Sequence, residues 1–136
     1  MQNERTTELE WPDFYPENCP PAEAERASGT VYHLVQHDPP QTEDFITYYE
    51  ENPKFFESNP HLICKGCGVS VYTDLRDIRR LKKRSKKLKN RHIAEGKLNP
   101  TLGKIQHTPS RRRKSHHTWW VPVGVKCWFV FKVIGE

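Results

Sequence analysis

The two parts of this chain carry opposite charges, and this division limits how the chain can fold. Residues 1–57 contain 13 acidic and 3 basic side chains, whereas residues 58–136 contain 4 acidic and 19 basic ones. Such asymmetry is typical of a nucleic-acid-binding domain with an acidic arm, or of one domain whose halves neutralise each other across a cleft. The two alternatives predict different functions.

The length of 136 residues suits one domain with its own hydrophobic core. Eleven prolines are many for this length, and residues 11–21 are particularly rich in them. Proline disrupts both helix interiors and central strands. We therefore expect an extended, acidic, Pro-rich arm over residues 1–28, whose aromatic side chains pack on the domain, and a single α+β domain over residues 29–136.

The cysteine content and the apolar segments indicate where the protein resides. Four cysteines without a signal-like apolar segment after Met1 favour a reducing cytoplasm, where disulfides are not expected. The longest apolar stretch, residues 121–134, is interrupted by proline and lysine and is too short to span a bilayer. We therefore expect a soluble cytoplasmic protein without a membrane partner.

The order of the predicted elements indicates the fold class. Alternating apolar side chains predict strands at residues 30–36, 69–73, 92–95, 102–108, 116–121 and 125–134. Thr42 and Asp74 are suited to cap two helices, of which the first ends before Pro53 and the second extends to about residue 91. Residues 53–62 are expected to be a loop. This order predicts an α+β domain with a small mixed or antiparallel sheet and two helices.

Cys64 and Cys67 are separated by two residues, with glycines within and after the turn. Two thiolates at this spacing can bind one zinc ion from a tight turn. A structural zinc needs four ligands, and the chain has no second pair of this kind, so Cys19, Cys127 or a histidine would have to complete the site. The alternative is a tight loop with two reduced thiols.

A second candidate is the histidine-rich and tryptophan-rich strand at residues 116–121. Strand alternation places His116, Thr118 and Trp120 on one face, and His117 and Trp119 on the other. A histidine beside a hydroxyl and an aromatic ring is suited to proton transfer, to phosphate contact or to stacking of a base. The alternative is an edge strand whose tryptophans fill the core and whose histidines face solvent.

His33 lies on the first predicted strand, and Thr47 and Tyr49 lie on the helix that follows. A lone histidine on a strand usually has a structural role. His33 has a chemical role only if His116 or His117 lies opposite it, where the pair could act as acid and base.

Basic side chains are concentrated in two segments. Ten of the sixteen residues from 76 to 91 are Lys or Arg, and residues 111–114 are all basic. Such clusters are typical of phosphate-backbone binding, and like charges one helical turn apart destabilise a helix unless an anion neutralises them. The anion is a nucleic acid, an acidic protein such as an antitoxin, or the chain's own acidic half. The candidate contacts are Arg79, Arg80, Lys83, Lys86, Lys87, Arg111, Arg112, Arg113 and Lys114.

Several short segments, residues 32–35, 44–47, 68–74, 93–95 and 117–120, together resemble small bacterial ADP-ribosyltransferase-like proteins. The resemblance spans residues 30–134. It implies an α+β fold in which a residue of the first strand contacts NAD and a segment bearing Ser, Thr or Tyr supports the nicotinamide. It also implies a bacterial or phage toxin or effector that uses NAD.

The resemblance implies roles for individual residues of this chain. It assigns NAD binding to His33, the nicotinamide side to Thr47 with Tyr48 or Tyr49, and a place in the NAD pocket to Trp119. Many members use a catalytic glutamate on a late strand, for which Glu95 is the only reasonable candidate here. A histidine-based site that uses His116 or His117 is the alternative.

Two non-enzymatic functions compete with this interpretation. A nucleic-acid-binding module would combine a zinc knuckle, the basic helix and an exposed Trp119 or Trp120 that stacks on bases. An adaptor would bind protein through the charged halves alone. An enzyme requires His33 and one of the later histidines at a single concave site, whereas the binding module requires an exposed tryptophan beside the cations.

Overall fold

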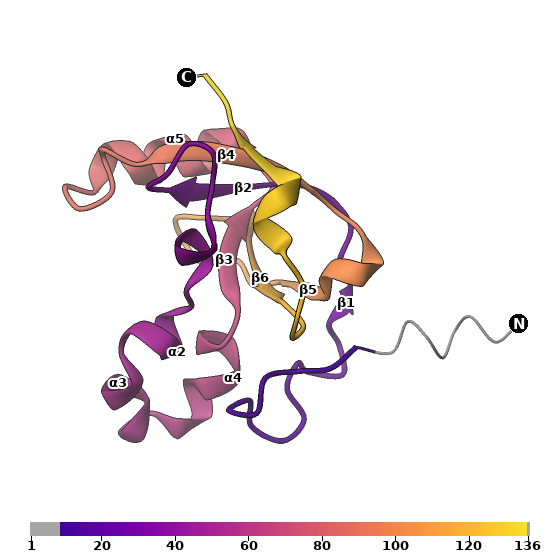
Figure 1. The fold of residues 1–136 in the computed structure, drawn as a ribbon. Helices are drawn as coiled ribbons and strands as arrows, with labels where there is room; N and C mark the ends of the chain where they lie inside the picture. The colour runs from indigo at the N-terminus through magenta and orange to yellow at the C-terminus, as the bar shows by residue number, and fades with distance from the viewer. Residues whose placement is uncertain (1–8, 136) are drawn as a thin grey trace, which may run out of the picture.

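The computed structural model describes residues 9–135, which form a seven-stranded antiparallel sheet with four α-helices. The strands are β1 (Glu25–Arg26), β2 (Gly29–Val35), β3 (Val69–Tyr72), β4 (His92–Leu98), β5 (Lys104–His107), β6 (His116–Trp120) and β7 (Phe131–Val133). Their spatial order is β1-β5-β6-β3-β2-β4-β7 (Figure 1). The predicted single α+β domain with an antiparallel sheet is confirmed.

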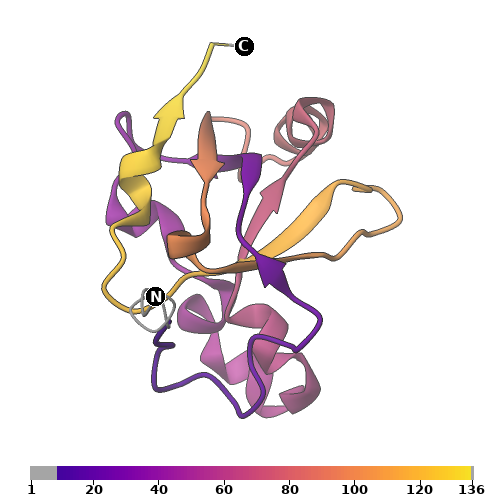
Figure 2. The same ribbon diagram turned by 90° about the vertical axis from the view of Figure 1, so that its right-hand side faces the viewer.

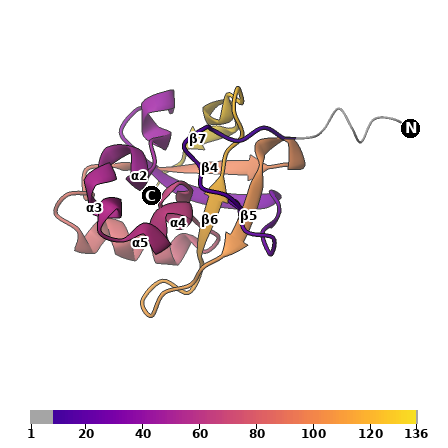
Figure 3. The ribbon, with the colours of Figure 1, turned by 90° about the horizontal axis from the view of Figure 1, so that it is seen from below.

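Three short helices gather at one end of the sheet, while a longer helix packs on one of its faces (Figures 1 and 3). The α-helices are α2 (Tyr48–Glu51), α3 (Pro53–Glu57), α4 (Ile63–Gly66) and α5 (Leu75–Arg84). Short 3₁₀ turns are η1 (Thr42–Phe45), η2 (Pro60–Leu62), η3 (Pro100–Leu102) and η4 (Cys127–Val130). Within residues 9–135, no helix combines the length and the apolar character needed to cross a bilayer.

The two faces of the sheet bury separate hydrophobic clusters. One cluster centres on Val31, Val71 and Trp119, and the rings of Phe45 and Phe131 pack into it. The other holds Leu34, Tyr72, Ile78 and Ile93 beneath α5. Alternate residues of β2 and β3 point to opposite faces, so each strand contributes to both clusters.

The predicted helix over residues 42–52 is interrupted at Thr47. The Thr47 hydroxyl accepts a hydrogen bond from the Glu50 backbone N–H, and the Glu50 carboxylate accepts one from the Thr47 N–H. This reciprocal pair starts a new helix, α2, instead of continuing the preceding 3₁₀ turn. The predicted loop over residues 53–62 contains α3 and η2, each of which has proline at its first position, where proline is favoured.

The basic helix begins where the sequence predicts but is shorter. The Asp74 carboxylate accepts from the Arg76 N–H, which confirms Asp74 as the N-cap. The helix ends at Arg84, and Lys86 and Lys87 lie in the turn that follows. The Ser85 hydroxyl accepts from the Leu88 N–H, which stabilises that turn, and repulsion among the clustered cations opposes continuation of the helix.

The described part of the predicted arm is integrated into the domain (Figure 2). Strand β1 pairs with β5, and Ala24 and Ala27 are buried. Trp11 and Tyr15 pack against the cluster that contains Trp120, as expected for the aromatic residues of this segment. The first eight residues of the predicted arm lie outside the described residues.

A disulfide joins Cys19 of this segment to Cys64 at the second residue of α4. The sequence-based expectation of reduced thiols is therefore wrong for these two cysteines. The pair was not apparent from the sequence because 45 positions separate the two residues.

Candidate active site

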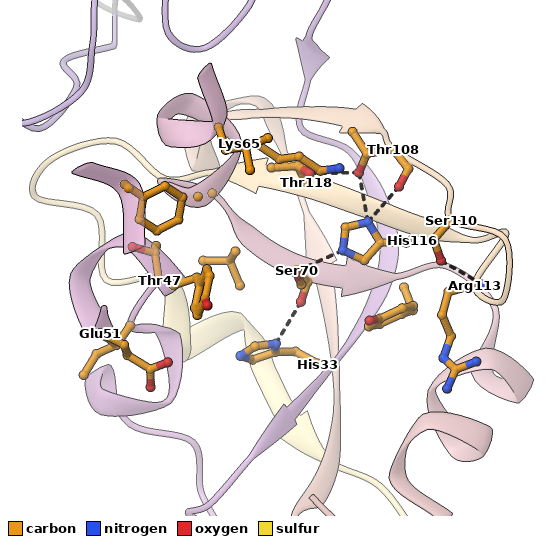
Figure 4. Close-up of a pocket in the computed structure, with 18 of the residues that line it drawn as sticks. His33, Thr47, Glu51, Lys65, Ser70, Thr108, Ser110, Arg113, His116 and Thr118 are labelled. Carbon is orange, nitrogen blue, oxygen red and sulfur yellow. Dashed lines mark hydrogen bonds between the residues drawn. The ribbon is translucent and has the colours of Figure 1, made fainter. Parts of the chain in front are cut away.

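A cleft of about 610 Å³ lies beside the junction of β2 and β3. Within the described range, these strands share a single register pair, Tyr32 with Tyr72, whereas β2 pairs with β4 along its whole length. The short helices flank one side of the cleft, and the hairpin between β5 and β6 flanks the other (Figure 4). Its volume lies within the usual range for small-molecule sites.

The walls of the cleft differ in character. The wall formed by the short helices and turns is largely apolar and contains Ile46, Tyr48, Phe55, Phe56 and Leu62. Another wall carries hydroxyl, imidazole and cationic groups from Lys65, Ser70, Thr108, Arg113, His116 and Thr118. The cleft is therefore suited to a ligand with an apolar or aromatic part and an anionic part.

A chain of hydrogen bonds connects four of these polar residues (Figure 4). The Ser70 Oγ atom lies 2.9 Å from Nε2 of His116. On the other side of the ring, Nδ1 of His116 lies 2.9 Å from the carbonyl oxygen of Thr108 and 2.9 Å from its hydroxyl. The Thr108 hydroxyl also lies 2.8 Å from that of Thr118.

These contacts define the tautomer of His116. The Thr108 carbonyl oxygen can only accept, so Nδ1 must carry the hydrogen. In the neutral ring, Nε2 then accepts from the Ser70 hydroxyl. Burial lowers the pKa of His116, and the nearby Lys65 ammonium contributes in the same direction. The neutral, proton-accepting form is thus favoured.

His33 lies at the opposite side of Ser70. Its Nδ1 is 3.1 Å from the Ser70 carbonyl oxygen, and its Nε2 is 2.6 Å from the carbonyl oxygen of Asp44. Burial lowers the pKa of His33, and both ring nitrogens face backbone acceptors. His33 therefore holds β3 against the η1 turn and positions Ser70, although its ring also lines the cleft.

Among the described residues, three charged side chains line the cleft. Lys65 and Arg113 come from the basic part of the chain, and Glu51 comes from the acidic part. The Nε atom of Arg113 is buried without a hydrogen-bond acceptor among the described residues. A buried N–H group without an acceptor is costly, so an anionic oxygen bound here would be stabilised.

The residues assigned to NAD by the resemblance are only partly brought together. His33 and Thr47 line the cleft, but the Thr47 hydroxyl is engaged in the cap of α2. Of the two tyrosine alternatives, Tyr48 lines the cleft, whereas Tyr49 does not line it and its ring stacks on Phe14. Trp119 has an exposed fraction of 0% and belongs to the core.

Of the predicted catalytic residues, the structure places only one in the cleft. His116 lines the cleft, but His117 lies on the other face of β6, where its ring stacks on that of His107. Glu95 pairs across the strands with Tyr32, on the face opposite to His33, and does not line the cleft. Of the carboxylates in the described part of the chain, that of Glu51 lines the cleft.

The predicted zinc knuckle is not formed. The Cys64 sulfur is bonded to Cys19, and burial raises the pKa of the Cys67 thiol to about 11, so this group stays protonated. The part of the chain that the structure describes contains no group of three or more His, Cys, Asp or Glu side chains arranged around a metal ion. The two glycines of the motif instead permit close packing, of the Phe56 ring on Gly66 and of the Thr118 methyl group on Gly68.

The predicted anion-binding cations are divided between two surfaces. Arg79, Arg80, Lys83, Lys86 and Lys87 are exposed on α5 and the following turn. Arg111, Arg112 and Lys114 are exposed on the hairpin, whereas Arg113 is half-buried in the cleft. The ion pairs Asp44–His37, Asp74–Arg76 and Asp77–Arg80 are local, so they do not join the acidic part of the chain to the basic part.

Sequence reasoning did not single out Ser70, Lys65 or Thr108. The sequence gives only a weak indication of Ser70, because it shows no more than a serine between two valines on a predicted strand. In the structure the two valines belong to a hydrophobic cluster, and the Ser70 side chain faces away from it. Its partner could be found only through the antiparallel register of β3 and β6, which sets Ser70 opposite Thr118 and beside His116.

Comparisons with protein-family models, with curated proteins and with solved structures gave no match. The functional interpretation therefore rests on the geometry of the cleft.

Proposed function

We propose that the cleft is the active site of an enzyme that acts on a nucleotide-like ligand, with NAD as the first candidate. This proposal is supported by the presence of His33 and His116 in the same cleft. An enzyme requires this arrangement, whereas a module that stacks bases on tryptophan does not. Trp119 and Trp120 have exposed fractions of 0% and 1%, so neither can stack on bases.

The opposed walls of the cleft agree with a ligand that carries both a planar ring and phosphate. Tyr48 and Phe55 provide aromatic faces, and both are partly exposed. Arg113 and Lys65 provide cations, and the buried Nε–H of Arg113 needs an acceptor such as a phosphate oxygen. His116 would serve as the proton acceptor, in place of the glutamate that the resemblance implies.

Replacing Arg113 by glutamine is expected to weaken NAD binding by about tenfold or more, because a hydrogen bond to a charged group contributes about 1.5–3 kcal/mol. Isothermal titration calorimetry with NAD, ADP-ribose and nicotinamide would measure the effect. Arg111→Gln is the matched control, since Arg111 is exposed on the same hairpin and does not line the cleft. An equal loss in both variants, or no NAD binding by the native protein, would contradict the proposal.

A second proposal concerns the basic surface on α5. We infer that it binds the phosphates of a nucleic acid, because Arg79, Arg80, Lys82, Lys83 and Lys89 border a hollow of about 630 Å³ on this surface. Cations closely spaced along a helix suit the regular spacing of phosphates.

Replacing both Arg79 and Lys83 by glutamine is expected to weaken binding of a labelled oligonucleotide and to reduce the slope of log K against log salt by about 1 per phosphate contact removed. Fluorescence anisotropy over a salt series would measure both effects. A variant with Lys97→Gln and Lys132→Gln removes the same charge from exposed positions on β4 and β7 and should change little. Oligonucleotide binding by the native protein that persists at high salt would refute a phosphate-led contact, and no binding at low salt would favour an acidic protein as the partner.

The cytoplasmic location stays a prediction. It would require Cys19 and Cys64 to be reduced in the cell, whereas the two cysteines are paired in this fold. Structural disulfides are typical of oxidising compartments.

A further inference from the structure

We propose that Ser70 is a covalent nucleophile, with His116 as its general base and the Thr108 carbonyl oxygen as the group that orients the imidazole. A hydroxyl nucleophile requires a base within hydrogen-bond reach and a third group that fixes the base. Ser70 meets the first condition at 2.9 Å from Nε2, and the Thr108 oxygen meets the second at 2.9 Å from Nδ1.

Ser70 is also accessible, as a nucleophile must be. It is exposed on β3 and lines the cleft, whereas its strand neighbours Val69 and Val71 are buried. The bond to His116 joins residues 46 positions apart and is not part of the regular sheet ladder. Packing of the sheet alone does not require this hydrogen bond.

The neighbouring groups favour charge development at Ser70. The Lys65 ammonium lies close enough to His116 to affect its pKa and faces the same cleft, so it can stabilise an anionic oxygen on the electrophile. Among residues 9–135 no carboxylate contacts Nδ1, and the orienting group is a neutral carbonyl. The apolar wall would hold an uncharged substituent of the substrate.

The substrate class is therefore an ester that carries an apolar substituent and an anionic group, the two parts that the walls of the cleft suit. As Ser70 Oγ bonds to the electrophilic carbon, its proton passes to Nε2 of His116. The bond to the leaving alcohol then breaks, and the alcohol takes the proton from His116. Water hydrolyses the resulting ester of Ser70 by the same route, with His116 again accepting and returning the proton.

A fluorophosphonate probe tests this assignment directly. Attack by Ser70 forms an Oγ–P bond, breaks the P–F bond and releases fluoride, while the serine proton passes to His116. Intact-mass spectrometry followed by peptide mapping is expected to find one adduct, on Ser70, that is absent in Ser70→Ala. His116→Gln should lower the labelling rate by about 10²-fold or more, since general-base catalysis contributes about 10²–10⁴-fold.

Two control substitutions distinguish labelling of this site from nonspecific reaction of the probe with other serines. Ser58→Ala removes an exposed serine at the end of α3, and His92→Gln changes an exposed histidine on β4, and neither should change the labelling rate. Circular dichroism confirms that each variant folds. Absence of an adduct on the native protein, an adduct elsewhere, or unchanged labelling in a folded His116→Gln protein would overturn the assignment. The result does not depend on NAD binding, so the two proposals can fail separately.

The pH profile provides a second readout. The labelling rate should rise with pH through the lowered pKa of His116 and become level at and above neutral pH, because the neutral ring is the base. The titratable and charged groups around the ring are Lys65, Tyr72, His107, Arg113 and His117. A rate that keeps rising tenfold per pH unit through neutral pH would instead indicate hydroxide-dependent attack and would overturn the role of His116.

Discussion

Replacing Trp119 by alanine is expected to lower the free energy of unfolding by about 3–5 kcal/mol, the usual cost of truncating a fully buried aromatic side chain. Trp119 has an exposed fraction of 0%, and its ring lies against Phe45 and Phe131. Its indole N–H also donates to the Leu102 carbonyl oxygen at 2.8 Å, and the substitution leaves this acceptor unpaired. Urea unfolding followed by circular dichroism would measure the loss.

Phe129→Ala is the matched control, because Phe129 is 73% exposed and its removal should change stability by no more than about 0.5 kcal/mol. The pair distinguishes a core tryptophan from a ligand-binding one. If Trp119→Ala kept native stability but lost NAD binding, the role that the resemblance assigns to Trp119 would be correct and its place in the core would not.

Trp119 also illustrates what could be predicted from the sequence. Alternation along residues 116–121 correctly grouped His116 with Thr118 and separated them from His117 and Trp119, because this pattern is local. It could not say which face packs on the core. That depends on β3 and on Phe45 and Phe131, which are distant in the sequence.

The same limit applies to the candidate site. Strands β2, β3 and β6 and the start of α5 were predicted because periodicity and capping act over a few residues. The contact of Ser70 with His116 and the disulfide span 46 and 45 positions. Such contacts follow from tertiary packing, which a periodicity or a motif does not encode.

The structure shows where the acidic and basic parts of the chain come together. The cleft is lined by Glu51 from the acidic part of the chain and by Lys65 and Arg113 from the basic part. Both parts therefore build one domain and one concave site. This favours the single-domain alternative over a basic domain with a separate acidic arm.

Reducing the Cys19–Cys64 disulfide is expected to lower the free energy of unfolding by about 4 kcal/mol. The chain-entropy estimate for closing a loop of this length gives this value, and removing native disulfides from small domains typically costs about 2–5 kcal/mol. Urea unfolding with and without reductant would measure the change. The double variant Cys19→Ser, Cys64→Ser should match the reduced protein and show no further response to reductant.

Reduction is expected to loosen the cleft together with the fold, because Cys64 is the second residue of α4 and directly precedes Lys65, which lines the cleft. The disulfide joins α4 to the N-terminal segment, and the Cys64 carbonyl oxygen accepts from the Trp120 indole N–H at 2.8 Å, so Cys64 connects α4 to that segment and to β6. Labelling of Ser70 by the fluorophosphonate should therefore slow on reduction even where the protein stays folded, because Lys65 is then held less firmly. Counting the free thiols of the unreduced, unfolded protein with a thiol reagent tests the pairing itself. Two thiols, from Cys67 and Cys127, would agree with the disulfide, and four would contradict it.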